Sequence, residues 1–107
     1  MHPVVKQLAL EYKDHLIRLY GAELDSLILF GSHARGDFHD ESDVDFAVIL
    51  RNPQSRTSAE IFKTSPIIAS LGLKYGMALS NFPTTKLKFE TSSQGIYQNI
   101  RREGIQI

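Results

Sequence analysis

Apolar side chains recur along the first half of this chain with two different periods. Between residues 3 and 20 they return about every 3.6 positions, as on one face of a helix, with Pro3 suited to the first turn and Gly21 to the C-terminal cap. Two short apolar runs follow, at about 26–30 and 44–50, and such runs are typical of buried strands. The pattern therefore predicts a helix followed by two strands.

The second half of the chain is predicted to hold a further strand among helices. The expected elements are a helix over 57–73, a strand over 77–82, a short helix from Pro83 through about Glu90, and a helix over 94–102 closed by Gly104. Pro66 should kink the first of these helices or split it in two. The order helix, strand, strand, helix, strand, helix predicts a mixed α/β (α+β) fold, with a short mixed sheet flanked by helices in one domain over 1–107.

Composition excludes several classes of protein. Lys plus Arg equals Asp plus Glu at 12 each, so no net charge favours direct binding of nucleic acid. Cysteine is absent, which excludes disulfides and thiolate zinc sites. No stretch approaches the ~20 apolar residues of a membrane span, and no signal peptide is visible at the start. We expect a cytoplasmic protein that does not enter a membrane.

The most informative chemistry lies between the two predicted strands. Gly31-Ser32 follows the first strand, and a glycine lets the backbone approach a ligand while a hydroxyl donates to phosphate oxygen. Asp43 and Asp45 open the second strand, where residues two apart face the same side. Paired carboxylates repel unless a cation lies between them, and carboxylates with phosphate suit Mg²⁺. The segment predicts a site for a metal–nucleotide complex, against the plainer reading of a polar turn whose aspartates only cap and solvate it.

The spacing Gly-Ser-x-Ala-Arg-Gly at 31–36, followed by Ser-Asp-x-Asp at 42–45, resembles the signature of nucleotidyltransferases with a DNA polymerase β-like core. The short chain is similar to their minimal branch, the MNT family. The resemblance implies that Asp43 and Asp45 bind Mg²⁺ and catalyse, and that ATP is the substrate. It implies nucleotide binding by the following residues: Gly31, Ser32, Arg35 and Ser42.

Three neighbouring side chains carry weaker signals. Arg35 could lie over the triphosphate, or it could pair with Asp37 or Asp43 and hold the loop. His33 and His39 flank the site without a partner histidine at metal-ligand spacing, so we expect surface residues.

The chain departs from the family at one functional position. Catalytic members carry a third acid on the strand after the second long helix, but here that strand holds Ala78, with Ser80 next on the same face, and no acid lies between Glu60 and Glu90. The acid would complete the metal site and act as general base, which typically contributes 10²–10⁴-fold. The bound metal, a partner protein or another acid could compensate; the candidate acids are Asp37, Asp40, Glu41 and Glu90.

The resemblance also implies a partner. Minimal members are commonly encoded beside a HEPN-domain ribonuclease and act as its antitoxin, some by transferring AMP to a toxin tyrosine. Our leading hypothesis is therefore an antitoxin that modifies a HEPN toxin. The alternatives are a non-catalytic module that neutralises the toxin by occlusion, and a transferase acting on a small molecule.

Overall fold

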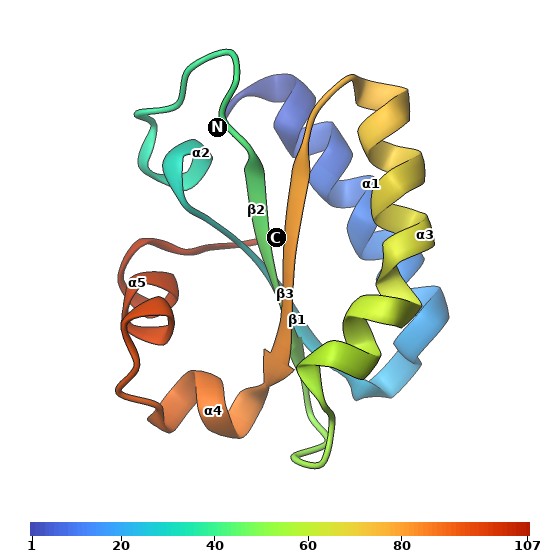
Figure 1. The fold of residues 1–107 in the computed structure, drawn as a ribbon, viewed down its shortest axis with the longest axis vertical. Helices are drawn as coiled ribbons and strands as arrows, with labels where there is room; N and C mark the ends of the chain where they lie inside the picture. The colour runs from blue at the N-terminus through green and yellow to red at the C-terminus, as the bar shows by residue number, and fades with distance from the viewer.

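The computed structural model describes all residues, 1–107, as a four-stranded sheet with helices on both faces (Figure 1). The elements in chain order are α1 (Pro3–Tyr20), η1 (Gly21–Glu23), β1 (Leu24–Phe30), α2 (Ser32–Arg35), β2 (Val44–Leu50), α3 (Thr57–Tyr75), β3 (Leu79–Thr85), α4 (Lys86–Thr91), α5 (Gly95–Glu103) and β4 (Ile105–Gln106). The predicted mixed α/β class is confirmed.

The sheet is mixed, with strand order β3-β2-β1-β4. β1 is antiparallel to both neighbours, and β2 and β3 are parallel, joined by the long crossover helix α3. Because β1 ends where β2 begins, Phe30 lies opposite Asp45. The segment between these two strands is therefore held at one end of the sheet.

Each face of the sheet packs against its own helices. Helices α1 and α3 cover one face and α4 and α5 the other, as Figure 1 shows. Alternate residues of β2 explain this division, because Phe46 and Val48 belong to the α1 side while Ala47 and Ile49 pack beside Ile100 of α5. Burial on both faces makes β2 the central strand of the core, and this fixes the direction in which Asp43 and Asp45 point.

Pro66 bends helix α3 but does not split it. Helix α3 is continuous through Pro66 but changes direction near its N-terminal end in Figure 1, so a kink, not a split, is the result. The hydroxyls of Thr64 and Ser65 donate to carbonyls one turn back, as expected where a proline interrupts the helix ladder.

Pro83 was predicted to begin a helix, and this is wrong. It lies within β3 opposite Val48, and the helix begins at Lys86, where the Thr85 hydroxyl caps it. β3 is an edge strand, so a residue without an N–H is tolerated there. The two-residue β4, which pairs with Ile28 and Leu29, was not predicted. None of the helices combines the length and the apolarity needed to cross a membrane.

Candidate functional site

The predicted nucleotide segment lies at the end of the sheet where β1 ends and β2 begins. Gly31 leaves β1 and directly precedes the short helix α2, and the loop after α2 returns the chain to Asp43. A cavity of about 510 Å³ opens here, and none of its lining residues is hydrophobic. Its lining residues are Ser32, Arg35, Asp37, His39, Glu41, Ser42, Asp43 and Asp45. The structure therefore brings the predicted site residues together, with Gly31 immediately behind the lining.

Gly31 has a backbone conformation that other residues rarely adopt, with φ 77° and ψ −159°. A Cβ atom at this position would collide with the Asp45 carboxylate. The glycine is needed both for the sharp exit from β1 and for the close approach of the backbone to the aspartate.

Asp45 alternates with the β2 residues that pack beside α5, and Asp43, directly before the strand, lines the same cavity as Asp45. Burial raises the pKa of Asp45 above its ordinary value of 3.8, and the Asp43 charge raises it further. His33, the Ser80 hydroxyl and Arg35 act in the opposite direction but do not cancel the rise. This electrostatic cost is the one that a divalent cation between two carboxylates would remove, so the donor set fits Mg²⁺.

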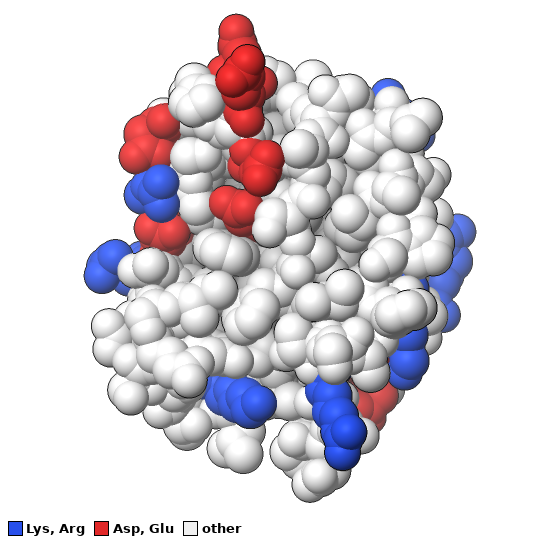
Figure 2. Space-filling view, viewed as in Figure 1, with Lys and Arg blue, Asp and Glu red and all other residues white.

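Acidic side chains gather at this end of the molecule in Figure 2, whereas Lys and Arg lie mostly along the other edges. Of the residues that line the cavity, four are carboxylates and one is an arginine. No group of three or more His, Cys, Asp and Glu side chains is arranged to hold a metal ion, so the pair Asp43 and Asp45 stands without a third ligand from the chain.

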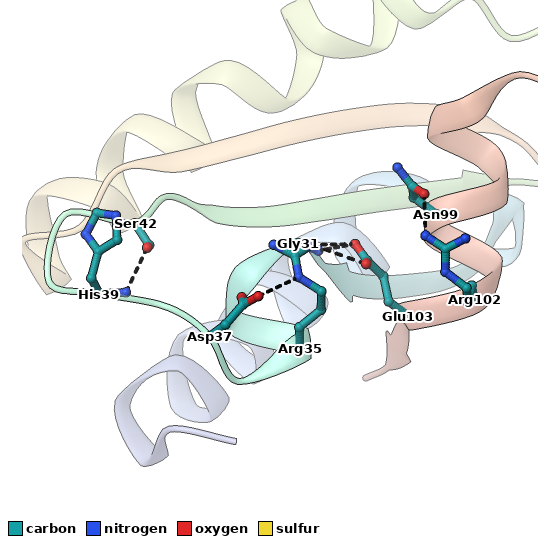
Figure 3. A network of polar contacts seen from close by, with 8 residues as sticks. All are labelled: Gly31, Arg35, Asp37, His39, Ser42, Asn99, Arg102 and Glu103. Carbon is teal, nitrogen blue, oxygen red and sulfur yellow. Dashed lines mark hydrogen bonds and ion pairs between the residues drawn. The ribbon is translucent and has the colours of Figure 1, made fainter.

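Arg35 lines the cavity but is held by ion pairs (Figure 3). Its Nε donates to Asp37 at 3.1 Å and its Nη1 donates to both carboxylate oxygens of Glu103, at 3.1 and 3.2 Å. Asp37, followed by Glu103, raises the pKa of the guanidinium. Of the two readings that the sequence left open, pairing within the loop is the one seen, with Glu103 as a partner that the sequence did not indicate.

Two residues near the cavity differ in exposure. The prediction that His33 is a surface residue is wrong: it is 7% exposed and stacks on Phe38, with 4.5 Å between ring centroids. Its Nε2 lies 3.4 Å from the Ser42 carbonyl oxygen, so the buried ring contacts the loop between α2 and β2. His39 is exposed as expected, and its backbone N–H donates to the Ser42 hydroxyl at 2.9 Å.

The register of β3 identifies the residue beside the aspartates. Ser80 pairs with Asp45 across the parallel strands, so the two side chains face the same way. Ala78, the expected position of the missing third acid, precedes the strand, and its carbonyl accepts from the Val44 N–H. The register therefore places Ser80 beside Asp45.

Comparisons with solved structures show the same fold in two complexes. The chain is similar to a protein in the crystal structure of a toxin–antitoxin with AMP-PNP, with TM-score 0.62 and 20% identity, covering 90% of this chain and 69% of that one. It is also similar, with TM-score 0.52 and 18% identity, to a chain in the structure of a tri-AMPylated Shewanella oneidensis HEPN toxin with an MNT antitoxin, covering 94% and 69%. At these identities the likeness concerns the fold alone.

Sequence comparisons are more specific. A protein of Methanocaldococcus jannaschii named "putative protein adenylyltransferase" is 37% identical over 71 residues, which covers 65% of this chain and 69% of that protein. The sequence model of the nucleotidyltransferase domain matches residues 10–105, which include the whole of the 31–45 segment and its flanking strands. The chain therefore belongs to the nucleotidyltransferase domain family.

Proposed function

We propose that this chain is a minimal nucleotidyltransferase that transfers AMP from ATP to a hydroxyl group of a partner protein. The observation that carries the proposal is the pair Asp43 and Asp45, which face one side of β2 beside the Gly31 turn, in a cavity with no hydrophobic lining. Two acids side by side in a partly buried position raise the free energy of the empty protein, and a metal-bound triphosphate would relieve this.

The residues have distinct proposed roles. Asp43 and Asp45 would hold Mg²⁺, while the Ser32 and Ser42 hydroxyls would face the phosphates. Gly31 would serve by letting the backbone pass close to the Asp45 carboxylate. When bound, the ion neutralises charge on the phosphates and stabilises the pyrophosphate that leaves. The acceptor oxygen bonds to the α-phosphorus as the bond between that phosphorus and the pyrophosphate oxygen breaks, and the hydroxyl proton passes to water.

We propose a HEPN-domain toxin as the partner and a tyrosine hydroxyl as the acceptor, so that the chain acts as an antitoxin in the cytoplasm. Support comes from the relative named as a putative protein adenylyltransferase and from the similar fold in one complex whose toxin is described as tri-AMPylated. Residues 1–107 would act as one domain, and the acceptor hydroxyl would enter the cavity that Asp43 and Asp45 line.

A second candidate function is neutralisation by occlusion, without chemistry. The observation that favours it is Ser80, which occupies the register position beside Asp45 and carries no carboxylate. Without that group the chain offers two acids to the reaction in place of three, and a general base typically contributes 10²–10⁴-fold.

The deciding experiment combines the purified chain, a purified HEPN-domain ribonuclease, Mg²⁺ and ATP labelled at the α-phosphate. We expect label on the ribonuclease with the native chain and none with Asp43→Asn/Asp45→Asn. The control is Asp14→Asn/Glu23→Gln, which removes two exposed carboxylates outside the cavity. Transfer of label by the Asp43→Asn/Asp45→Asn variant would refute the mechanism. If the native chain and this variant both inhibit the ribonuclease and neither labels it, occlusion is established.

A further inference from the structure

We infer that Glu103, the last residue of α5, is a positioning residue for the nucleotide-binding turn, so that the C-terminal helix is a working part of the site. This inference rests on the proposed function, but one part of it, that Glu103 holds the turn at residues 31–35, can be tested without nucleotide. Glu103 lies 72 residues from Gly31 in sequence.

The Glu103 carboxylate contacts both ends of the turn (Figure 3). The Gly31 N–H donates to Oε1 at 3.0 Å, and Arg35 Nη1 donates to the same oxygen at 3.1 Å and to Oε2 at 3.2 Å. The Glu103 side chain is only 12% exposed, whereas the other partner of Arg35, Asp37, is 62% exposed. Both carboxylates are charged, but Glu103 is the less exposed of the two and alone also accepts from the Gly31 N–H, so it is the partner that joins the two ends of the turn.

The direction of these hydrogen bonds shows whether the Glu103 carboxylate supports the turn or competes with phosphate for it. Leu29 pairs with Ile105, and continuing this antiparallel register by two residues brings Gly31 opposite Glu103. The Gly31 N–H therefore points toward the β4 side, while its missing Cβ would point at Asp45 on β2. Glu103 is also absent from the cavity lining. It holds the turn from behind and leaves the cavity free for phosphate.

The end of α5 is closely seated against β1, which makes this support rigid. A Cβ atom on Gly104 would collide with the Ile100 carbonyl and with the Ile28 side chain. Ile100 itself is 1% exposed in the core between α5 and the sheet. Gly104 thus allows the chain to pass close to β1 directly after Glu103, and the carboxylate has little freedom to leave the turn.

Loss of the carboxylate should loosen the turn in a defined way. The Gly31 N–H would have no acceptor in the protein, and Arg35 would keep only the exposed Asp37. The Ser32 hydroxyl would then no longer be held in a constant position relative to Asp45. Small misplacements of positioning groups lower reaction rates strongly, so both ATP affinity and turnover should fall.

The test uses Glu103→Gln and Glu103→Ala in the full chain, with Arg102→Gln as matched control. Arg102 is the adjacent residue of α5, and its side chain contacts Asn99 and not the turn (Figure 3). Amide hydrogen exchange in the nucleotide-free protein is measured over residues 31–35, and the KM for ATP and kcat are measured in the transfer reaction.

We expect Glu103→Ala to speed exchange at Gly31 and to raise KM by about tenfold. Glu103→Gln, which keeps an acceptor for the Gly31 N–H but loses the charge that Arg35 contacts, should raise KM by about threefold and is isosteric enough to fold. Arg102→Gln should change neither quantity.

Native exchange and native KM in both Glu103 variants would overturn the inference, as would a lower KM, because a lower KM means that the carboxylate competes with phosphate. If the native chain transfers nothing, the proposed function fails by itself. Unchanged hydrogen exchange in Glu103→Gln and Glu103→Ala would then still refute the inference that Glu103 holds the turn. Faster exchange would uphold that part of the inference.

Discussion

At the scale of single residues, the site is defined by groups that are unfavourable without a ligand. Asp45 is partly buried beside a second carboxylate, and its pKa is raised by burial first and by Asp43 second. Gly31 adopts a backbone conformation that costs other residues of order 1–3 kcal/mol. Glycine at position 31 avoids that cost, whereas the cost at Asp45 is one that a bound cation would relieve.

We predict that Asp45→Asn makes the nucleotide-free protein more stable while abolishing transfer. The folded pKa lies above the unfolded value, so ionised Asp45 opposes folding at neutral pH, and this cost is absent below the ordinary pKa of 3.8, where the carboxyl is neutral in both states. Thermal unfolding at pH 7 should therefore show a higher Tm for the variant than for the native chain. This difference in Tm should vanish as the pH falls below the ordinary pKa of 3.8. A lower Tm at pH 7 would contradict the prediction.

Ser80→Asp should increase AMP transfer. The substitution adds a carboxylate in register with Asp45, on the same face of the sheet. Because general base catalysis typically contributes 10²–10⁴-fold, we expect a gain of at least about tenfold even if the geometry is imperfect. Ser80→Asn is the matched control without a charge. Transfer by the Ser80→Asp variant that is no faster than that of the native chain would indicate that Ser80 does not lie at the reacting group.

At the scale of elements, a chain of polar groups joins three of them through the core. The buried Tyr12 of α1 donates to Asn81 Oδ1 of β3 at 2.8 Å, and Asn81 Nδ2 donates to the Thr64 hydroxyl of α3 at 2.9 Å. Thr64 in turn donates to the Glu60 carbonyl at 2.9 Å. The network joins the edge strand β3 to α1 and α3, the two helices that cover one face of the sheet.

We predict that Asn81→Leu destabilises the protein by about 2 kcal/mol, because the Tyr12 and Thr64 hydroxyls lose their shared partner inside the protein. For a domain of this size this is a fall in Tm of about 10 °C. Asn99→Leu, on the exposed side of α5, should change Tm little. Equal Tm values for the two variants, measured by thermal unfolding, would refute a structural role for the network.

At the scale of the whole molecule, positive and negative side chains are equal in number but unevenly distributed over the surface. Lys plus Arg and Asp plus Glu are 12 each, yet four carboxylates and one arginine line the cavity. This distribution repels a free nucleoside triphosphate and attracts divalent cations. Binding of ATP should therefore depend on the cation.

We predict that ATP alone leaves Tm unchanged and that ATP with Mg²⁺ raises it. A ligand at one hundred times its Kd stabilises the folded state by about 2.7 kcal/mol, which corresponds to a rise of several degrees. Removal of Mg²⁺ with a chelator should reverse the rise, and Asp43→Asn/Asp45→Asn should not show it. Equal shifts with and without the cation would show that nucleotide binds without it.

The sequence by itself determined the local features of this protein. The helix over 3–20 and the strand over 44–50 were predicted with the bounds that the structure has, because apolar periodicity reports burial directly. The common side of Asp43 and Asp45 follows from the two-residue period of a strand.

Only the tertiary structure decided which distant residues complete the site. The contact of Glu103 with Gly31 and the register that sets Ser80 beside Asp45 depend on how elements far apart in sequence pack together. Pro83 entered β3 because its strand lies at the edge of the sheet, where no neighbour needs the missing N–H. A residue's periodicity shows whether it is buried, but the partner that it meets is set by packing between elements.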